Sequence, residues 1–346
     1  MTSHIITTDT ASRTGKLTEH WAILGAGSIG CLWAAYLCKT NIPITLLLKN
    51  QATQKIWQQQ KGLCLELGEH VEQLGANINT RSVEELFNKN PITLKQVAVE
   101  DRASIDFLIV TTKAHQTKDA ILSITSLLKH TTTILLMQNG LGVYEELRTA
   151  LPDTDIFCAS TTEGAYQKKR FHVVHAGQGN TFLGAFETTN SNPELLTSIQ
   201  EVLSATGLKV DIDSQIQRRL WDKLAINCAI NGLTVIHQCQ NGKLLDLPKT
   251  VTRMKMICEE VASVMLKKGI SSNEIPVTGA SLFETVEKVA IATQHNYSSM
   301  LQDFTHQRPT EINYINGYLL RQADELNLHC PYNIELLEQV NQLTHY

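Results

Sequence analysis

Three polar residues at helical spacing interrupt a stretch that is otherwise apolar. Lys223, Asn227 and Asn231 follow one another four residues apart, and every residue between them is apolar. A helix brings side chains with this spacing onto one stripe, where an amine and two carboxamides would present hydrogen-bond donors. A buried polar group without a partner costs roughly 1–3 kcal/mol. The stripe is therefore predicted to line a polar cleft, unless its members bond to neighbouring backbone.

A glycine motif near the start of the chain has the chemistry to bind phosphate. It follows the apolar run 21–24 and precedes a helical pattern, which is the strand-to-helix context that a dinucleotide fingerprint requires. The first glycine permits a tight turn, the second lets the backbone approach a pyrophosphate, and the third allows close packing. Free N–H groups at the helix start attract the anion. The predicted cofactor-binding turn consists of Gly25, Ala26, Gly27, Ser28, Ile29 and Gly30.

The end of the second strand bears on the choice of cofactor. Proteins that bind NAD carry an acidic residue near this point, where it bonds the ribose 2′-hydroxyl. Here Lys49 follows the strand 44–48, and a cation suits the 2′-phosphate of NADP. The sequence thus favours NADPH (NADP+), although Lys49 could equally be a solvated lysine at a strand end.

Two more polar side chains follow predicted strands, at 106–111 and 133–137. Lys113 comes after the first and Asn139 after the second. Open α/β sheets bind ligands at the carboxyl ends of their strands. Lys113 could meet an anionic group, and the Asn139 carboxamide could donate and accept hydrogen bonds near a nicotinamide.

The elements that must position these residues change in type along the chain. Strand and helix signals alternate up to about residue 212, which predicts a doubly wound, Rossmann-type parallel sheet. Short β-like runs between residues 156 and 186, including 171–174 and 181–184, predict antiparallel strands that close the edge of this sheet.

Helical periodicity replaces the strand signals in the rest of the chain. Helices are expected at 216–235, 251–266, 282–292 and 311–323. We therefore expect a flexible N-terminal extension at residues 1–20, an NADP-binding domain at 21–212 and a helical substrate and catalytic domain at 213–346.

Composition excludes some classes of protein. The 346 residues are 42% hydrophobic and 18% charged with a formal net charge of −4, which favours a soluble protein over one with a broad nucleic-acid-binding surface. No apolar run approaches the length of a membrane helix. The eight cysteines include no Cys-x-x-Cys pair. Reduced thiols in a cytoplasmic protein are expected, and the oligomeric state stays open, with self-association of the helical domain possible.

A metal site is not expected. His172 and His175 lie three apart in a predicted strand, where such positions point to opposite faces. We interpret the pair as histidines that face the surface or a loop.

Longer motifs in the second half of the chain resemble the ketopantoate reductase (2-dehydropantoate 2-reductase) family. With the glycine motif, Lys113 and Asn139, the resemblance extends from about Trp21 to Arg321. The segments that carry it are 223–231 with Asn241-Gly242, Ile257–Val261, Ser298–Asp303 and Thr310–Gly317.

This resemblance implies NADPH-dependent reduction of ketopantoate to (R)-pantoate in pantothenate and coenzyme A biosynthesis. It implies that Lys223 is the general acid that protonates the carbonyl oxygen. It implies that the substrate's carboxylate and hydroxyl are bound by Asn227, Asn231, Asn241 and Ser299. It also implies that the cofactor is bound by Lys113, Asn139, Ala165 and Glu311, in addition to the glycine turn.

The chemistry requires groups of these types. Hydride transfer to a ketone develops negative charge on oxygen, which an ammonium stabilises before it gives up a proton. The chain departs from the family at Gly232, where proline is frequent, and in residues 1–20, which have no counterpart.

Two other functions remain open from the sequence. One is a related reductase of another 2-keto acid or imine, because function lives in the site and not in the fold. The other is a non-catalytic protein that senses NADP. A sensor has no need of a proton donor, so Lys223 argues against it.

Overall fold

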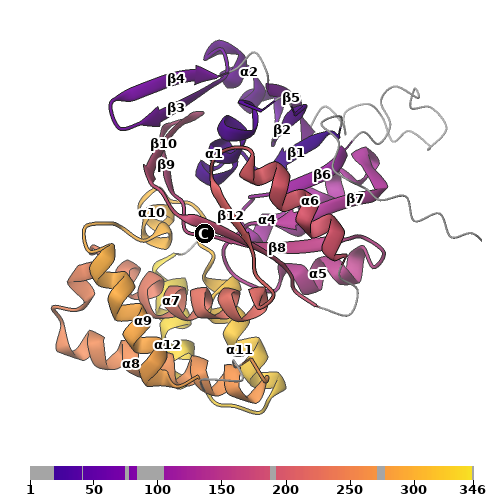
Figure 1. Cartoon of the computed structure of the whole chain (residues 1–346). Coiled ribbons are helices and arrows are strands. Elements are labelled where there is room, and N and C mark those ends of the chain that lie inside the picture. Colours follow the sequence, from indigo (N-terminus) through magenta and orange to yellow (C-terminus); the bar gives the residue numbers. More distant parts are fainter. Residues whose placement is uncertain are drawn as a thin grey trace, which may run out of the picture.

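The computed structural model describes residues 19–40, 42–74, 78–83, 105–187, 192–270 and 277–344. Figure 1 shows a sheet domain built from the first part of the chain, with a domain of helices packed beside it. The expected N-terminal extension, apart from residues 19 and 20, lies outside the described residues.

The first domain is built on an eight-stranded sheet of order β12-β11-β8-β7-β6-β1-β2-β5. From β5 to β8 neighbouring strands run parallel, whereas β11 runs antiparallel to β8. The predicted parallel sheet with an antiparallel edge is thus confirmed. The strands are β1 (Trp21–Leu24), β2 (Ile44–Leu48), β5 (Ile78–Ser82), β6 (Ile105–Val110), β7 (Leu128–Leu136), β8 (Ile156–Thr161), β11 (Asn180–Ala185) and β12 (Lys209–Ile212).

Helices cover both faces of this sheet, which explains the unbroken apolar runs in its central strands. Every residue of β1 and β2 is buried, as expected where both faces of a parallel strand are covered. The helices of this domain are α1 (Ser28–Leu37), α2 (Gln51–Gln59), α4 (Ala114–Ser123), α5 (Val143–Ala150) and α6 (Pro193–Ser204), with a 3₁₀ turn η2 (Thr125–Leu127).

A second sheet, of order β4-β3-β10-β9, corrects one prediction. Its strands are β3 (Leu63–Leu67), β4 (His70–Leu74), β9 (Gly164–Lys169) and β10 (His172–Gly177). The run 171–174 was expected at the edge of the main sheet, but β10 pairs with β3 and β9. The position beside β8 is taken by β11, and the apolar side chains of Phe171 and Val173 join the core around α1 instead.

The second domain is helical, as predicted. Its elements are α7 (Ile216–His237), η3 (Asn241–Leu244), α8 (Pro248–Lys267), α9 (Gly279–Ala292), α10 (Ser299–Thr305), η4 (Ile312–Tyr314), α11 (Asn316–Glu325) and α12 (Pro331–Leu343). The single helix expected at 311–323 is wrong, because Ile315 has a non-helical backbone (φ −108°, ψ −92°) that separates η4 from α11.

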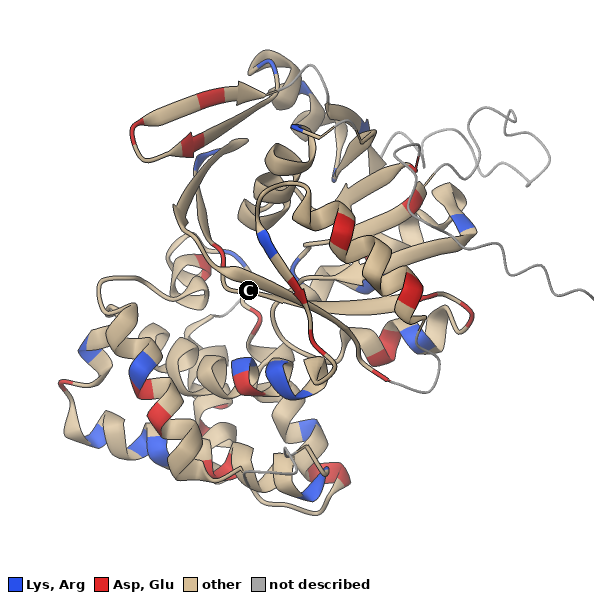
Figure 2. Ribbon diagram, viewed as in Figure 1, with Lys and Arg blue, Asp and Glu red and all other residues tan. Residues whose placement is uncertain are grey.

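Charged residues of both signs are interspersed on the helical domain (Figure 2). No helix among the described residues combines the length and the apolar character needed to cross a membrane.

Candidate active site

The glycine motif forms the turn between β1 and α1, and its geometry shows why glycine is needed. Gly25 has φ +111°, which L side chains rarely adopt. A Cβ on Gly30 would overlap the Gly25 carbonyl oxygen, whereas a Cβ on Gly27 would have no atom within 4 Å. Gly25 and Gly30 therefore close the turn, and Gly27 leaves open space where a pyrophosphate can approach the backbone.

The start of α1 provides hydrogen-bond donors beside this open space. Gly27 is the N-cap, and no side chain caps the helix. The carbonyl of Gly25 is held by Thr111, which directly follows β6 and whose Oγ1 donates to it at 2.8 Å. The first N–H groups of α1 thus stay available to an anion.

Lys49 follows β2 directly and is exposed to solvent. Next to it, Asn50 caps α2 by accepting a hydrogen bond from the Thr53 N–H at 2.9 Å. The lysine therefore stands at the carboxyl edge of the sheet, one strand away from the glycine turn.

Lys223 lies where the two domains meet. It lines a hollow together with Asn227 from its own helix and with Gln138 and Asn139, which follow β7. Its Nζ donates a hydrogen bond to the Thr161 carbonyl at 3.2 Å. Burial lowers the pKa of Lys223 from 10.5 to about 8, against an opposing contribution from the Glu311 carboxylate. The amine therefore changes its protonation state at a lower pH than an ordinary lysine, near pH 8.

An ion-pair cluster joins the domains on another side of the site. The Lys113 Nζ lies 2.7 Å from Asp303 Oδ2 and 3.1 Å from Glu311 Oε2. The other carboxylate oxygen of Glu311 accepts a hydrogen bond from the Ala114 N–H at 3.0 Å. Burial by itself would lower the pKa of Lys113, but the two carboxylates raise it above its ordinary value. Lys113 is therefore a fixed cation, unlike Lys223.

The remaining predicted substrate residues lie further along α7 and on the elements that follow it. Asn231 and Asn241 are 6% and 8% exposed. The Asn241 Nδ2 donates to Thr293 Oγ1 at 2.9 Å, whereas its Oδ1 is buried and has no hydrogen-bond partner among the described residues. The Asn241 Oδ1 can therefore accept a hydrogen bond from a ligand.

Ser299 is exposed as the first residue of α10, and its neighbour Ser298 is the buried N-cap. The Ser298 hydroxyl lies 2.6 Å from that of Thr234, which donates to the Asn231 carbonyl at 2.7 Å. This bond connects α10 to α7, so Ser299 is fixed relative to the turn that contains Asn231.

Three neighbours of the site were not assigned from the sequence. Gln138 lines the hollow, Thr161 offers its carbonyl to Lys223, and Asp303 pairs with Lys113. Asp303 is the last residue of the motif 298–303, so its place in that motif could have identified it as a site residue. Ala165, predicted at the nicotinamide end, lies in β9, paired with His175 of β10.

The two histidines of β10 have different surroundings. His172 is partly exposed and lies 2.9 Å from Glu66, whereas the His175 side chain is 1% exposed and 2.7 Å from Glu163. The surface interpretation is therefore wrong for His175, because a buried carboxylate satisfies its ring. No group of three or more potential ligands for a metal ion occurs among the described residues.

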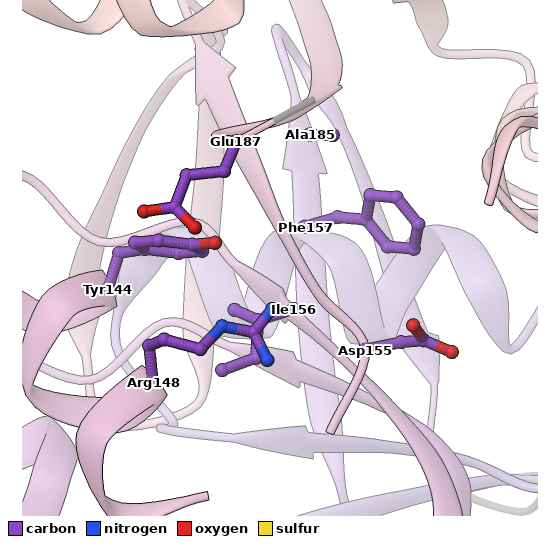
Figure 3. Close-up of a pocket in the computed structure, with 7 residues that line it drawn as sticks. All are labelled: Tyr144, Arg148, Asp155, Ile156, Phe157, Ala185 and Glu187. Carbon is purple, nitrogen blue, oxygen red and sulfur yellow. The ribbon is translucent and has the colours of Figure 1, made fainter. Parts of the chain in front are cut away.

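A further hollow lies away from the ligand edge. It is lined by the start of β8 (Ile156, Phe157), the end of β11 (Ala185) and residues of α5, and Figure 3 shows the Tyr144 ring beside Arg148. Arg148 already donates to two backbone carbonyls. The hollow is at the amino end of the parallel strands, opposite to Lys223.

Fold and site together define a Rossmann-type dinucleotide-binding protein with a helical second domain. Models of "Ketopantoate reductase PanE/ApbA" and of its C-terminal domain match residues 21–188 and 215–344. The 2-dehydropantoate 2-reductase of Vibrio cholerae is 32% identical over 321 residues, which cover 93% of this chain and 96% of the relative. That of Escherichia coli O157:H7 is 34% identical over 320 residues, 92% and 93% of the two chains.

Solved structures share the fold at lower identity. A ketopantoate reductase of this family from Ralstonia eutropha has a TM-score of 0.79 at 23% identity, covering 94% of this chain and 98% of its own. A D-mandelate dehydrogenase in complex with NADH has a TM-score of 0.80 at 23% identity with the same coverage. The chain belongs to the ketopantoate reductase family, and it is an oxidoreductase acting on a CH–OH group.

Proposed function

We propose that this protein reduces 2-dehydropantoate to (R)-pantoate with NADPH, a step of pantothenate and coenzyme A biosynthesis. The observation that carries the proposal is Lys223, a lysine with a depressed pKa in a hollow that Asn139 and Asn227 also line. This hollow adjoins the carboxyl ends of the parallel strands, where a dinucleotide binds in this fold.

The residues of the N-terminal domain fit a dinucleotide. The open space above Gly27 and the uncapped start of α1 suit a pyrophosphate. Lys113, Asn139 and Ala165, together with Glu311 of the helical domain, would hold the part of the cofactor nearest to the substrate. The bound cofactor supplies the hydride, and the protein supplies placement and electrostatic stabilisation.

Lys223 would act as the general acid. Its ammonium stabilises the charge that develops on the ketone oxygen and then gives its proton to that oxygen. A pKa of about 8 leaves most of the lysine protonated at neutral pH while making the proton easier to transfer than from an ordinary lysine.

The substrate's carboxylate and hydroxyl would be held by Asn227, Asn231, Asn241 and Ser299. The amides and the hydroxyl of these side chains can donate to a carboxylate. The Asn241 Oδ1, a buried acceptor that no described residue donates to, suits the substrate's hydroxyl, which can donate to it.

NADPH preference would rest on Lys49. Its exposed ammonium, one strand away from the glycine turn, suits a 2′-phosphate. The test compares kcat/KM for NADPH and NADH in the native protein and in Lys49→Glu, with ketopantoate as substrate. Preference for NADPH in the native protein that reverses in the variant supports the proposal. Equal or better efficiency of the native protein with NADH overturns it.

We also propose that the protein is cytoplasmic. We propose in addition that the boundary between its two domains lies between residues 212 and 213. All eight cysteines are free, and burial raises the pKa of most of these thiols, so that they stay protonated. Thiols of this kind suit a reducing compartment. The division falls between the last strand of the sheet, β12, and the first long helix, α7.

A further inference from the structure

A chain of hydrogen-bonded polar side chains outside the assigned residues runs from α1 to the turn between β8 and β9. The Tyr36 hydroxyl lies 2.8 Å from His175 Nδ1, and His175 Nε2 lies 2.7 Å from Glu163 Oε2. The side chains of His175 and Glu163 are each 1% exposed. None of the steps proposed above uses these three residues.

Glu163 fixes the turn between β8 and β9 from several directions. Its backbone N–H donates to Thr161 Oγ1 at 3.1 Å, and its carboxylate accepts from the Gly179 N–H at 3.0 Å. A Cβ on Gly179 would overlap the backbone of Thr162, so only glycine permits this approach. The turn is thus held between β10 and the start of β11.

The last residue of β8, directly before this turn, carries the group that contacts Lys223. The Thr161 carbonyl accepts the hydrogen bond from Lys223 Nζ, and Thr161 itself is 8% exposed. Its hydroxyl also accepts from Thr181 of β11 at 2.9 Å. The position of the Thr161 carbonyl therefore depends on the bonds that Glu163 makes two residues further along the chain.

Burial of a carboxylate such as that of Glu163 costs desolvation free energy, which an apolar side chain of the same volume would not. A buried ion pair is often no more stabilising than apolar residues of the same volume, but it fixes its partners in one geometry. Here the fixed partners extend from the last turn of α1, where Tyr36 lies, to the β8–β9 turn beside Thr161, which contacts Lys223. From the same hairpin, Gln167 donates to the Ala26 carbonyl in the glycine turn at 3.0 Å.

We propose that Glu163 is a positioning residue, which acts through His175, Tyr36 and the β8–β9 turn to hold the Thr161 carbonyl against Lys223. The proposal rests on the proposed role of Lys223 as proton donor. In this proposal, the chain of hydrogen bonds aligns the Lys223 ammonium relative to α1, the helix that begins at the glycine turn.

A displaced ammonium affects proton transfer more than substrate binding. Loss of Glu163 is therefore expected to lower kcat while KM for ketopantoate stays nearly constant. The bond to Thr161 favours the charged lysine, so weakening it lowers the pKa of Lys223. The fall of kcat/KM at alkaline pH should then begin at a lower pH, with Glu311, the carboxylate that acts on Lys223, left in place.

The experiment measures NADPH oxidation with ketopantoate for Glu163→Ala, Glu163→Gln and Tyr36→Phe. Glu163→Ala should lower kcat about threefold to tenfold, the scale of one or two hydrogen bonds. Glu163→Gln should restore part of the loss, because its amide oxygen can still accept from the Gly179 N–H. Tyr36→Phe removes only the far bond and should have the smallest effect.

Glu66→Ala is the matched control, because it removes a carboxylate as Glu163→Ala does. The Glu66 carboxylate pairs with His172 of β10 and with Lys168 of β9, and neither residue belongs to the β8–β9 turn. The control should keep the native kcat and pH profile. Unchanged kcat and pH profile in folded Glu163→Ala would overturn the proposal, as would an equal loss in Glu66→Ala. If Glu163→Ala does not fold, a native kcat and pH profile in Glu163→Gln has the same meaning.

Parallel measurement of Lys223→Ala separates the two proposals. A large loss in Lys223→Ala with no loss in the Glu163 variants contradicts only the positioning role. Full turnover in Lys223→Ala contradicts the proposed proton donor itself.

Discussion

The pH dependence of turnover follows from the surroundings of Lys223. A general acid must be protonated, and burial lowers the pKa of this lysine from 10.5 to about 8. The difference corresponds to about 3 kcal/mol against the charged form. The folded-state pKa is depressed, so the protonated acid predominates below pH 8 and is lost as the pH rises through that value.

The assay is kcat/KM for ketopantoate, with saturating NADPH, between about pH 6 and pH 10. The predicted profile is flat up to about pH 7.5 and then falls roughly tenfold per pH unit, as expected for one essential proton. Lys223→Arg serves as the control, because its guanidinium stays charged over this range. The variant should be slow and should lack the alkaline fall.

A native profile that stays flat up to pH 10 would refute the reasoning. It would mean either that the lysine retains its ordinary pKa in spite of burial or that proton transfer does not limit kcat/KM. An alkaline fall that persists in Lys223→Arg would assign the titrating group to another residue.

Three further predictions concern the turn, the substrate and stability. Gly30→Ala should abolish NADPH binding, measured by fluorescence titration, because its Cβ would overlap the Gly25 carbonyl; native affinity would contradict this account of the turn. Asn241→Leu should lower kcat/KM for ketopantoate by about tenfold but hardly change it for 3,3-dimethyl-2-oxobutanoate, which lacks the hydroxyl; equal losses would remove Asn241 from that role. Lys223→Met should raise the free energy of unfolding at pH 7 by about 1–3 kcal/mol, and denaturant melts should show this gain vanishing as the pH approaches 10.5.

The sequence predicted those parts of the molecule that local patterns determine. The turn 25–30 was predictable because strand, glycines and helix are contiguous, and the stripe from Lys223 to Asn231 because helical spacing is regular. The helical second domain followed from the same periodicity. The site roles came from longer motifs that resemble a known family.

The pairing of strands far apart in the chain and the contacts made by backbone groups could not be predicted from the sequence. The pairing of β10 with β3 joins segments about a hundred residues apart, and no local signal distinguishes it from pairing at the sheet edge. The bond from Lys223 to Thr161 uses a backbone carbonyl, which every residue has. The break at Ile315 likewise depends on packing between the domains, where Tyr314 accepts a hydrogen bond from Leu141.

The most direct test of the central claim is NADPH oxidation with ketopantoate by the native protein and by Lys223→Ala. We predict turnover by the native protein and a fall in kcat of roughly 10²-fold or more in the variant, the scale of a lost general acid. Turnover that the substitution leaves unchanged would contradict the proposed mechanism. Absence of native turnover, with NADPH still bound, would contradict the proposed substrate.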